Sequence, residues 1–370
     1  MRGPRYPAAR ITAERVHPRF RGLQRNGAAL PDIEEMERLI DAGFWASLRR
    51  EEGSSPKISL AFLAPQDSGS SLSFERGLSL TPDALSRLAP AAERPGIHLG
   101  VWHDGVDLRV WGTTRAIPAF CFVLEVIAPG LVVLKYRRED ASAKFVNVAV
   151  VEGDTVKVLE GAAPTVPGCT NLVTALLGFD AGASPRASNV LVELAVSMRS
   201  HQRGGTLLVV PSGTECWRDS IRHPIHYSVS PKFSHLAELL EEPAAAHEER
   251  RWQDAFHRTI EAIAGLTAVD GATVVTDRFE VLAFGAKISR RDQSPSVENV
   301  ILSEPVEGFE PHVLPALQTG GTRHISAAQF ANDQQDAMAM VASQDGRFTI
   351  FSWSECDAMV RAHRVETLLL

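Results

Sequence analysis

The chain has 370 residues, of which 44% are hydrophobic and 22% are charged, so its composition is that of an ordinary globular protein and its length favours about two domains. Its net charge of -7 gives no sign of general affinity for nucleic acids or acidic membranes. No stretch approaches the roughly 18 consecutive apolar residues of a membrane helix, and the first residues contain no apolar core of a secretory signal. We therefore expect a cytoplasmic protein with no nucleic-acid or membrane partner.

The four cysteines lie far apart in the sequence, without a CxxC pair or a neighbouring group of histidines; they are Cys121, Cys169, Cys216 and Cys356. This spacing is not that of a disulfide framework or a zinc site. It predicts four small, buried residues in a reduced protein.

The N-terminal part of the chain is predicted to be a disordered tail followed by an α+β domain. Residues 1–30 are rich in arginine and are expected to be disordered, and residues 31–240 form the domain. Apolar residues at helical spacing predict a helix over 31–50, and a second helix should begin near Thr81. Six short strands separated by tight turns follow between residues 97 and 159, which predicts an antiparallel meander.

Residues 241–247 are acidic and rich in proline and alanine, which predicts a linker and the start of a second domain over 248–370. That domain is expected to open with a helix ending near Gly265 and to continue with two strands. A long loop over 289–319, a short helix and a strand hairpin should complete it. The alternation predicts an α/β fold, a mixed sheet flanked by helices.

Two short motifs lie about fifty residues apart in the second domain: Asp270-Gly271-Ala272 before a predicted strand, and Gly321-Thr322-Arg323-His324 at the start of a predicted helix. Either motif alone is more often a plain turn or surface. The N-terminus of a helix attracts an anion such as a triphosphate, and the hydroxyl, guanidinium and imidazole of residues 322–324 add hydrogen-bond donors. A carboxylate such as Asp270 is what a metal-dependent phosphoryl or nucleotidyl transfer requires.

In this order, with the run GTRHISAAQFANDQQDAMAMVASQDG, the second domain resembles the diadenylate cyclase domain. The resemblance implies that two ATP molecules are joined into cyclic di-AMP, with Mg²⁺ or Mn²⁺ held by Asp270, which is also a candidate base. It implies ATP contacts at Gly271 and Ala272, small enough to leave room for base or ribose, and at Gly321, Thr322, Arg323 and His324. It further implies that two such domains face each other, so the protein should self-associate.

One departure from the family keeps a second hypothesis open. Where cyclases carry a third basic residue after Arg-His, this chain carries Ile325. Loss of a phosphate contact is worth about 1.5–3 kcal/mol. The alternative is therefore a catalytically silent nucleotide-binding sensor that keeps the cyclase fold.

The segment Arg203–Leu240 resembles the sensor domains, of the DACNV kind, that precede cyclase domains in some bacterial proteins. Its polar loop is suited either to an unidentified small polar ligand or to plain packing; the residues concerned are Glu215, Trp217, Arg218, Asp219, Arg222, His223 and His226. Residues 104–105 and 112–115 imitate the two cyclase motifs at much shorter spacing, and we expect an ordinary hairpin there.

Overall fold

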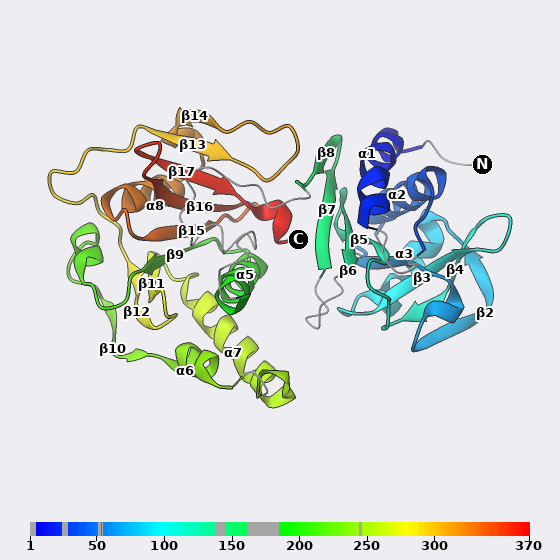
Figure 1. The fold of residues 1–370 in the computed structure, drawn as a ribbon, viewed down its shortest axis with the longest axis horizontal. Coiled ribbons are helices and arrows are strands. Elements are labelled where there is room, and N and C mark those ends of the chain that lie inside the picture. Colours follow the sequence, from blue (N-terminus) through cyan, green and yellow to red (C-terminus); the bar gives the residue numbers. More distant parts are fainter. Residues whose placement is uncertain are drawn as a thin grey trace. The chain divides into compact units, whose positions relative to one another are not determined.

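The protein is described here from a computed structural model that covers residues 5–23, 29–50, 53, 55–137, 145–160, 185–243 and 246–370. The described residues form a mixed α/β structure with seven α-helices and two mixed sheets. The chain divides into two compact units, residues 1–161 together with Leu370, and residues 162–369 (Figure 1).

The first unit contains an eight-stranded sheet in the order β2-β4-β3-β1-β5-β6-β7-β8. Its strands are β1 (Ile58–Phe62), β2 (Ser71–Ser79), β3 (His98–His103), β4 (Leu108–Thr114), β5 (Phe122–Ala128), β6 (Leu131–Arg137), β7 (Phe145–Glu152) and β8 (Thr155–Val158). Strands β5 to β8 form the expected meander. The sheet is nevertheless mixed, because β1 inserts between β3 and β5 and runs parallel to β3.

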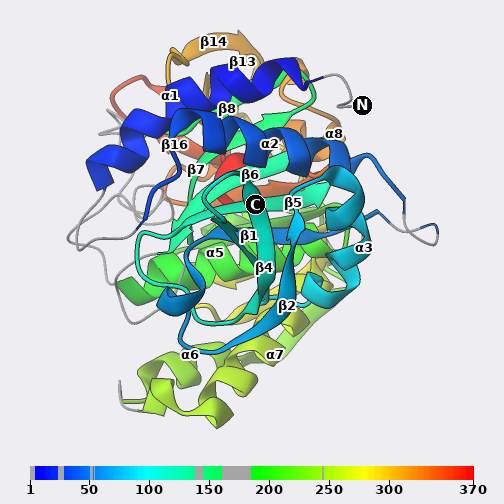
Figure 2. The same ribbon diagram turned by 90° about the vertical axis from the view of Figure 1, so that its right-hand side faces the viewer.

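Helices α1 (Pro7–Leu23), α2 (Ile33–Ser47) and α3 (Pro82–Ala92) pack into the main core of the first unit, and α1 and α2 lie side by side (Figure 2). Asp32 caps α2 in a capping box with Glu35, and Thr81 caps α3 as its sequence suggested.

The prediction of a disordered tail was wrong for α1. Its apolar stripe, which includes Val16 and Phe20, is buried in the core, and the Phe20 ring contacts the rings of Phe122 and Tyr136. The arginines that suggested a disordered tail lie on the other face of an amphipathic helix.

The second unit contains a nine-stranded sheet in the order β10-β12-β11-β9-β15-β16-β17-β13-β14. Its strands are β9 (Gly205–Val210), β10 (Tyr227–Phe233), β11 (Ala272–Thr276), β12 (Val281–Ala286), β13 (Asn299–Ser303), β14 (His312–Pro315), β15 (Met338–Ala342), β16 (Phe348–Ser354) and β17 (Met359–Arg364). Helices α5 (Pro185–Ser200), α6 (His235–Glu241) and α7 (Arg250–Leu266) pack into a core on one face of this sheet, and α8 (Thr322–Asp333) packs into a core on the other.

The boundary between the units differs from the expected linker at 241–247. Every residue of β9 is buried, because the strand pairs with β11 and β15 and has helices over both faces. A strand in the centre of a sheet cannot belong to another domain, so residues 205–243 are part of the second unit. The Pro/Ala-rich segment merely joins α6 to α7.

Two further expectations were wrong in detail. The region 289–319 is not one long loop, since β13 pairs parallel to β17 and β14 pairs with β13. Of the cysteines, Cys121 is buried, but Cys216 and Cys356 are exposed; all three are free, and Cys169 lies outside the described residues. No helix in the described ranges is long and apolar enough to cross a membrane.

Each sheet contains a buried histidine bonded to a serine on a neighbouring parallel strand. Ser59 and His98 (Oγ to Nδ1, 2.7 Å) join β1 to β3, and Ser303 and His363 (2.6 Å) join β13 to β17. Burial is the main cause that lowers the pKa of each imidazole to about 4, so both rings are neutral at neutral pH.

Phe20→Ala should lower the free energy of unfolding of the first unit by about 3–5 kcal/mol, because a fully buried aromatic ring is lost from the core. Ile11→Ala in the same helix is the matched control, since Ile11 is 55% exposed and should cost little. Urea unfolding followed by circular dichroism measures both. Equal transitions for Phe20→Ala and the wild type would mean that α1 does not contribute to the core.

His98 should make the first unit less stable in acid. Its folded pKa of about 4 lies below the ordinary value of 6.5, so between these values the unfolded chain binds the proton and the folded one does not. The stability is therefore complete above pH 6.5 and is lost as pH falls towards 4, by about 3 kcal/mol. Hydrogen exchange of the β1 and β3 amides should show a flatter pH dependence in His98→Asn, and parallel curves would contradict the assignment.

Candidate functional site

The two sequence motifs meet at one edge of the second sheet. The parallel strands β9 and β11 begin there, and the strands that run antiparallel to them, β12 and β15, end there. Asp270 lies two residues before β11. A short connection joins helix α8 to β15, so the helix and the strand run in opposite directions. The start of α8 therefore lies near the end of β15. A Cβ atom on Gly204 would lie 3.0 Å from Nη1 of Arg323 and 3.2 Å from the carbonyl oxygen of Ala342, which fixes this placement.

Asp270 is an exposed carboxylate between two cations. Its side chain is 88% exposed and forms an ion pair with Lys287, which follows β12. The hydrogen bond and charge of Lys287, together with the weaker influence of Arg323, lower the pKa of the Asp270 carboxyl. Asp270 is therefore ionised at neutral pH. The charge of Arg323 acts on this carboxylate although the two residues are 53 positions apart in the sequence.

Gly271 and Ala272 are packed against the neighbouring strands of the sheet. Gly271 has φ +124°, and a Cβ atom there would lie 2.4 Å from the carbonyl carbon of Gly285. Ala272 is 1% exposed and pairs with Thr206 and Ala286 on the two neighbouring strands. The small size of both residues is therefore explained by strand packing, because the backbone of β12 lies where a side chain would stand. Their contact with ATP stays a prediction.

Gly321 begins α8, and the fold itself does not require glycine there. Its φ is -77°, and a Cβ atom would meet nothing within 4 Å. Among the residues that the structure describes, no side chain caps this helix end, and the N–H groups of His324 and Ile325 donate to the Gly321 carbonyl. The first N–H groups of a helix have no partner within the helix, so an anion can accept hydrogen bonds from them.

Thr322 and Arg323 are exposed at the start of α8. Within the described part of the chain, Arg323 forms no hydrogen bond or ion pair, although its charge reaches Asp270. An exposed guanidinium with free donors beside open helix N–H groups is suited to a phosphate.

His324 is not placed as a surface donor. It is 3% exposed, its ring packs edge-on against Phe351, and a Cβ atom on Gly320 would lie 2.5 Å from its Nδ1. Burial lowers the pKa of the imidazole, so the ring is neutral at neutral pH. In the described part of the chain, its Nε2 is buried without a hydrogen-bond partner. His324 therefore packs in the core beneath the start of α8.

An aromatic pair lies beside the Asp270 motif. Tyr227 and Phe284 are directly opposite each other on β10 and β12, with ring centroids 4.8 Å apart and nearly parallel planes. A Cβ atom on Gly285 would lie 2.7 Å from the Tyr227 ring, so the ring covers this glycine. Tyr227 is 50% exposed, so part of its side chain is accessible to a ligand.

Sequence reasoning missed Lys287 and Tyr227. Lys287 was detectable in principle, because a lysine directly after the strand that pairs with the Asp270 strand must lie near that carboxylate. Tyr227 gave no such signal, since β10 precedes β12 by about fifty residues and its pairing depends on the tertiary fold.

The polar loop expected to bind a ligand is packed onto the sheet unit. Nε2 of Gln334 donates to the carbonyl oxygen of Cys216 (3.0 Å) and to Oγ of Ser220 (2.9 Å), and Trp217 is 1% exposed. Gln334 follows the last turn of α8, about 18 Å along the helix from Thr322. These contacts show that part of the loop packs on the sheet unit, while Arg222, His223 and His226 are exposed, so binding of a small ligand there stays a prediction.

No group of three or more His, Cys, Asp or Glu side chains gathers anywhere in the described ranges in a way that could hold a metal. Asp270 fits a hard divalent cation as a single ligand. Mg²⁺ commonly takes one or two carboxylates and completes its coordination with substrate phosphates and water.

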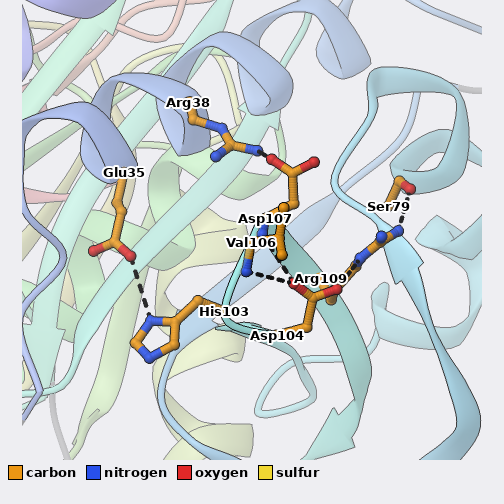
Figure 3. A network of polar contacts seen from close by, with 8 residues as sticks. All are labelled: Glu35, Arg38, Ser79, His103, Asp104, Val106, Asp107 and Arg109. Atoms are coloured by element: carbon orange, nitrogen blue, oxygen red, sulfur yellow. Dashed lines mark hydrogen bonds and ion pairs between the residues drawn. The ribbon is translucent and has the colours of Figure 1, made fainter.

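The imitation of the motifs in the first unit is an ordinary hairpin, as expected. Asp104 accepts the backbone N–H groups of Val106 (3.0 Å) and Asp107 (2.9 Å) and pairs with Arg109 (2.8 Å), which closes the β3–β4 turn. Figure 3 shows that Arg38 on α2 reaches the same turn and pairs with Asp107 (2.6 Å). These contacts stabilise the β3–β4 turn and connect it to α2.

The comparison with protein families finds one described domain in this chain. The family described as "probable sensor domain DACNV" matches residues 25–115, which run from before α2 through β4. The match supports a sensor domain in the first unit. The segment 203–240, in which the sequence suggested a resemblance to such domains, lies in the second unit and outside the matched residues. No curated protein matches the chain.

Gly271 and Gly321 should respond differently to alanine. Gly271→Ala should destabilise the second unit by about 2 kcal/mol or more, since a methyl group at positive φ collides with backbone. Gly321→Ala should change stability by less than about 0.5 kcal/mol. Thermal unfolding of both variants checks this pair, and equal losses would contradict the open space assigned at Gly321.

Proposed function

We propose that this chain is a diadenylate cyclase whose activity is controlled by a sensor domain in its N-terminal unit. The observation that carries the proposal is the meeting of Asp270 and Arg323 at one sheet edge, beside an uncapped helix end that begins with a glycine the fold does not need. A carboxylate, a free guanidinium and open N–H groups together match a metal-bound triphosphate.

In this proposal, Arg323, the hydroxyl of Thr322 and the first N–H groups of α8 bind phosphate oxygens. Asp270 would hold Mg²⁺ or Mn²⁺, which when bound supplies charge neutralisation to the phosphates. Because its pKa is lowered, Asp270 is a weak base, which favours the role of ligand over that of proton acceptor. The exposed part of Tyr227 offers an aromatic contact for the adenine.

The proposed reaction joins two ATP molecules. The 3′-hydroxyl oxygen of one ATP bonds to the α-phosphorus of the other, the bond from that phosphorus to pyrophosphate breaks, and the hydroxyl proton passes to solvent. The same step in the opposite sense closes the ring and releases a second pyrophosphate. Two sites must face each other for this, so we expect a two-fold pair of second units.

The rival is a catalytically silent nucleotide-binding protein with the same fold. Two observations favour it. Lys287 already neutralises Asp270, and Ile325, which stands where the third basic residue is expected, is half-buried and apolar. The DACNV match is consistent with either version, since a sensor domain can control an enzyme or a binding protein.

Full-length protein incubated with ATP and Mg²⁺ or Mn²⁺ should form cyclic di-AMP, detected by mass spectrometry. Asp270→Asn should abolish synthesis, because an amide of the same shape holds a divalent cation much more weakly. ATP binding without any product would favour the silent protein. Product formation by a well-folded Asp270→Asn variant would remove this residue from the reaction.

Arg323→Ala should weaken ATP binding about tenfold, because one charge-assisted phosphate contact is lost. Arg251→Ala is the matched control, since this arginine is 88% exposed and lies at the start of α7, at the other end of the helix from the Asp270 motif. Isothermal titration of each variant with ATP and Mg²⁺ measures the difference. Unchanged affinity in Arg323→Ala would mean that phosphate does not bind at the start of α8.

A further inference from the structure

Lys287 and Asp270 are held opposite each other by the backbone. In the antiparallel pair β11–β12, Ala272 pairs with Ala286. Asp270 lies two residues before the first position and Lys287 one residue after the second, and the Lys287 ammonium donates to the Asp270 carboxylate there. The carbonyl oxygen of Lys287 accepts the N–H of Arg222 (2.8 Å), which anchors the end of β12. The backbone at this end of β12 is therefore anchored, whereas the ion pair itself lies at the surface, where a ligand can displace it.

We propose that Lys287 is an internal competitor for the metal at Asp270, an inference that rests on the proposed function and adds a mode of control to it. A divalent cation needs the oxygens of the carboxylate that the Lys287 ammonium now occupies. To bind, the cation must displace that ammonium while Arg323 lies on the same corner. Two positive side chains beside one carboxylate oppose the entry of a further dication.

A nucleoside triphosphate removes this opposition. Its phosphates bring several negative charges to the corner, so the displaced Lys287 ammonium gains a phosphate oxygen as a new partner. Metal and triphosphate then bind better together than either binds alone, and by linkage the coupling is reciprocal. Lys287 thus keeps the site free of metal until nucleotide arrives.

Mn²⁺ binding to the full chain without nucleotide tests the competition, and water-proton relaxation detects even weak Mn²⁺ binding. Lys287→Met should bind Mn²⁺ about three- to tenfold more tightly than the wild type, as expected for removal of one exposed charge that competes and repels. Lys287→Arg, which keeps the charge, should bind like the wild type. The double variant Asp270→Asn, Lys287→Met should lose the gain, since the carboxylate is gone.

Lys232→Met is the control for net charge, because Lys232 forms a comparable ion pair with Glu280 (2.5 Å) elsewhere in the unit. It should leave Mn²⁺ affinity at the wild-type value. Should Lys287→Met prove unstable, Lys287→Gln offers the same loss of charge, and thermal unfolding shows which variant is usable.

Equal Mn²⁺ affinity for the wild type and the charge-removing variants would overturn the inference, as would a gain that persists in the double variant. A gain of the same size in Lys232→Met would also overturn it, since it would show a general effect of charge. Failure of the proposed function looks different: no cyclic di-AMP forms, whatever the Mn²⁺ titrations give.

Discussion

The second unit depends on the position of β9 between β11 and β15. Covered by helices on both faces and paired on both edges, this strand has no polar surface left and is buried along its whole length. Because β9 pairs parallel to β11, the turn between α7 and β11 lies at the edge of the sheet where β9 begins. Because β9 pairs antiparallel to β15, the end of β15 lies at the same edge, near the start of α8. Two polar segments that share no local contact are brought to one edge by this single hydrophobic strand.

The chemistry available at that edge follows from differences in exposure. Asp270, Lys287 and Arg323 are solvated, so their mutual influence is screened and can be rearranged by an incoming ligand. His324 is buried and neutral, so it stabilises the start of α8 by packing and adds no charge there. In the proposed function, these exposed charges redistribute around a triphosphate, and that redistribution separates catalysis from binding alone.

The two units use the same device inside their sheets. A serine on one strand bonds a buried histidine on the parallel neighbour, at Ser59–His98 and Ser303–His363. Each pair satisfies a polar group that burial would otherwise penalise, and it ties together a pair of parallel strands. Because the rings must stay neutral, both units share a sensitivity to acid that is separate from the function of either.

The sequence alone determined the elements whose signals are local. The capped helix at Asp32, the meander from Phe122 to Val158 and the strands on either side of Asp277 follow from periodicity and turn residues, and the glycine-led start of α8 follows from its motif. Composition misled where a local pattern had two meanings, as in the arginine-rich α1 and the linker-like segment before α7. Only the tertiary structure decided that β9 belongs to the second unit, that Gly271 serves strand packing, that His324 is buried and that Lys287 meets Asp270. These facts depend on which strands pair, and pairing is fixed by burial of both faces of a sheet, a property of the whole unit that no local pattern contains.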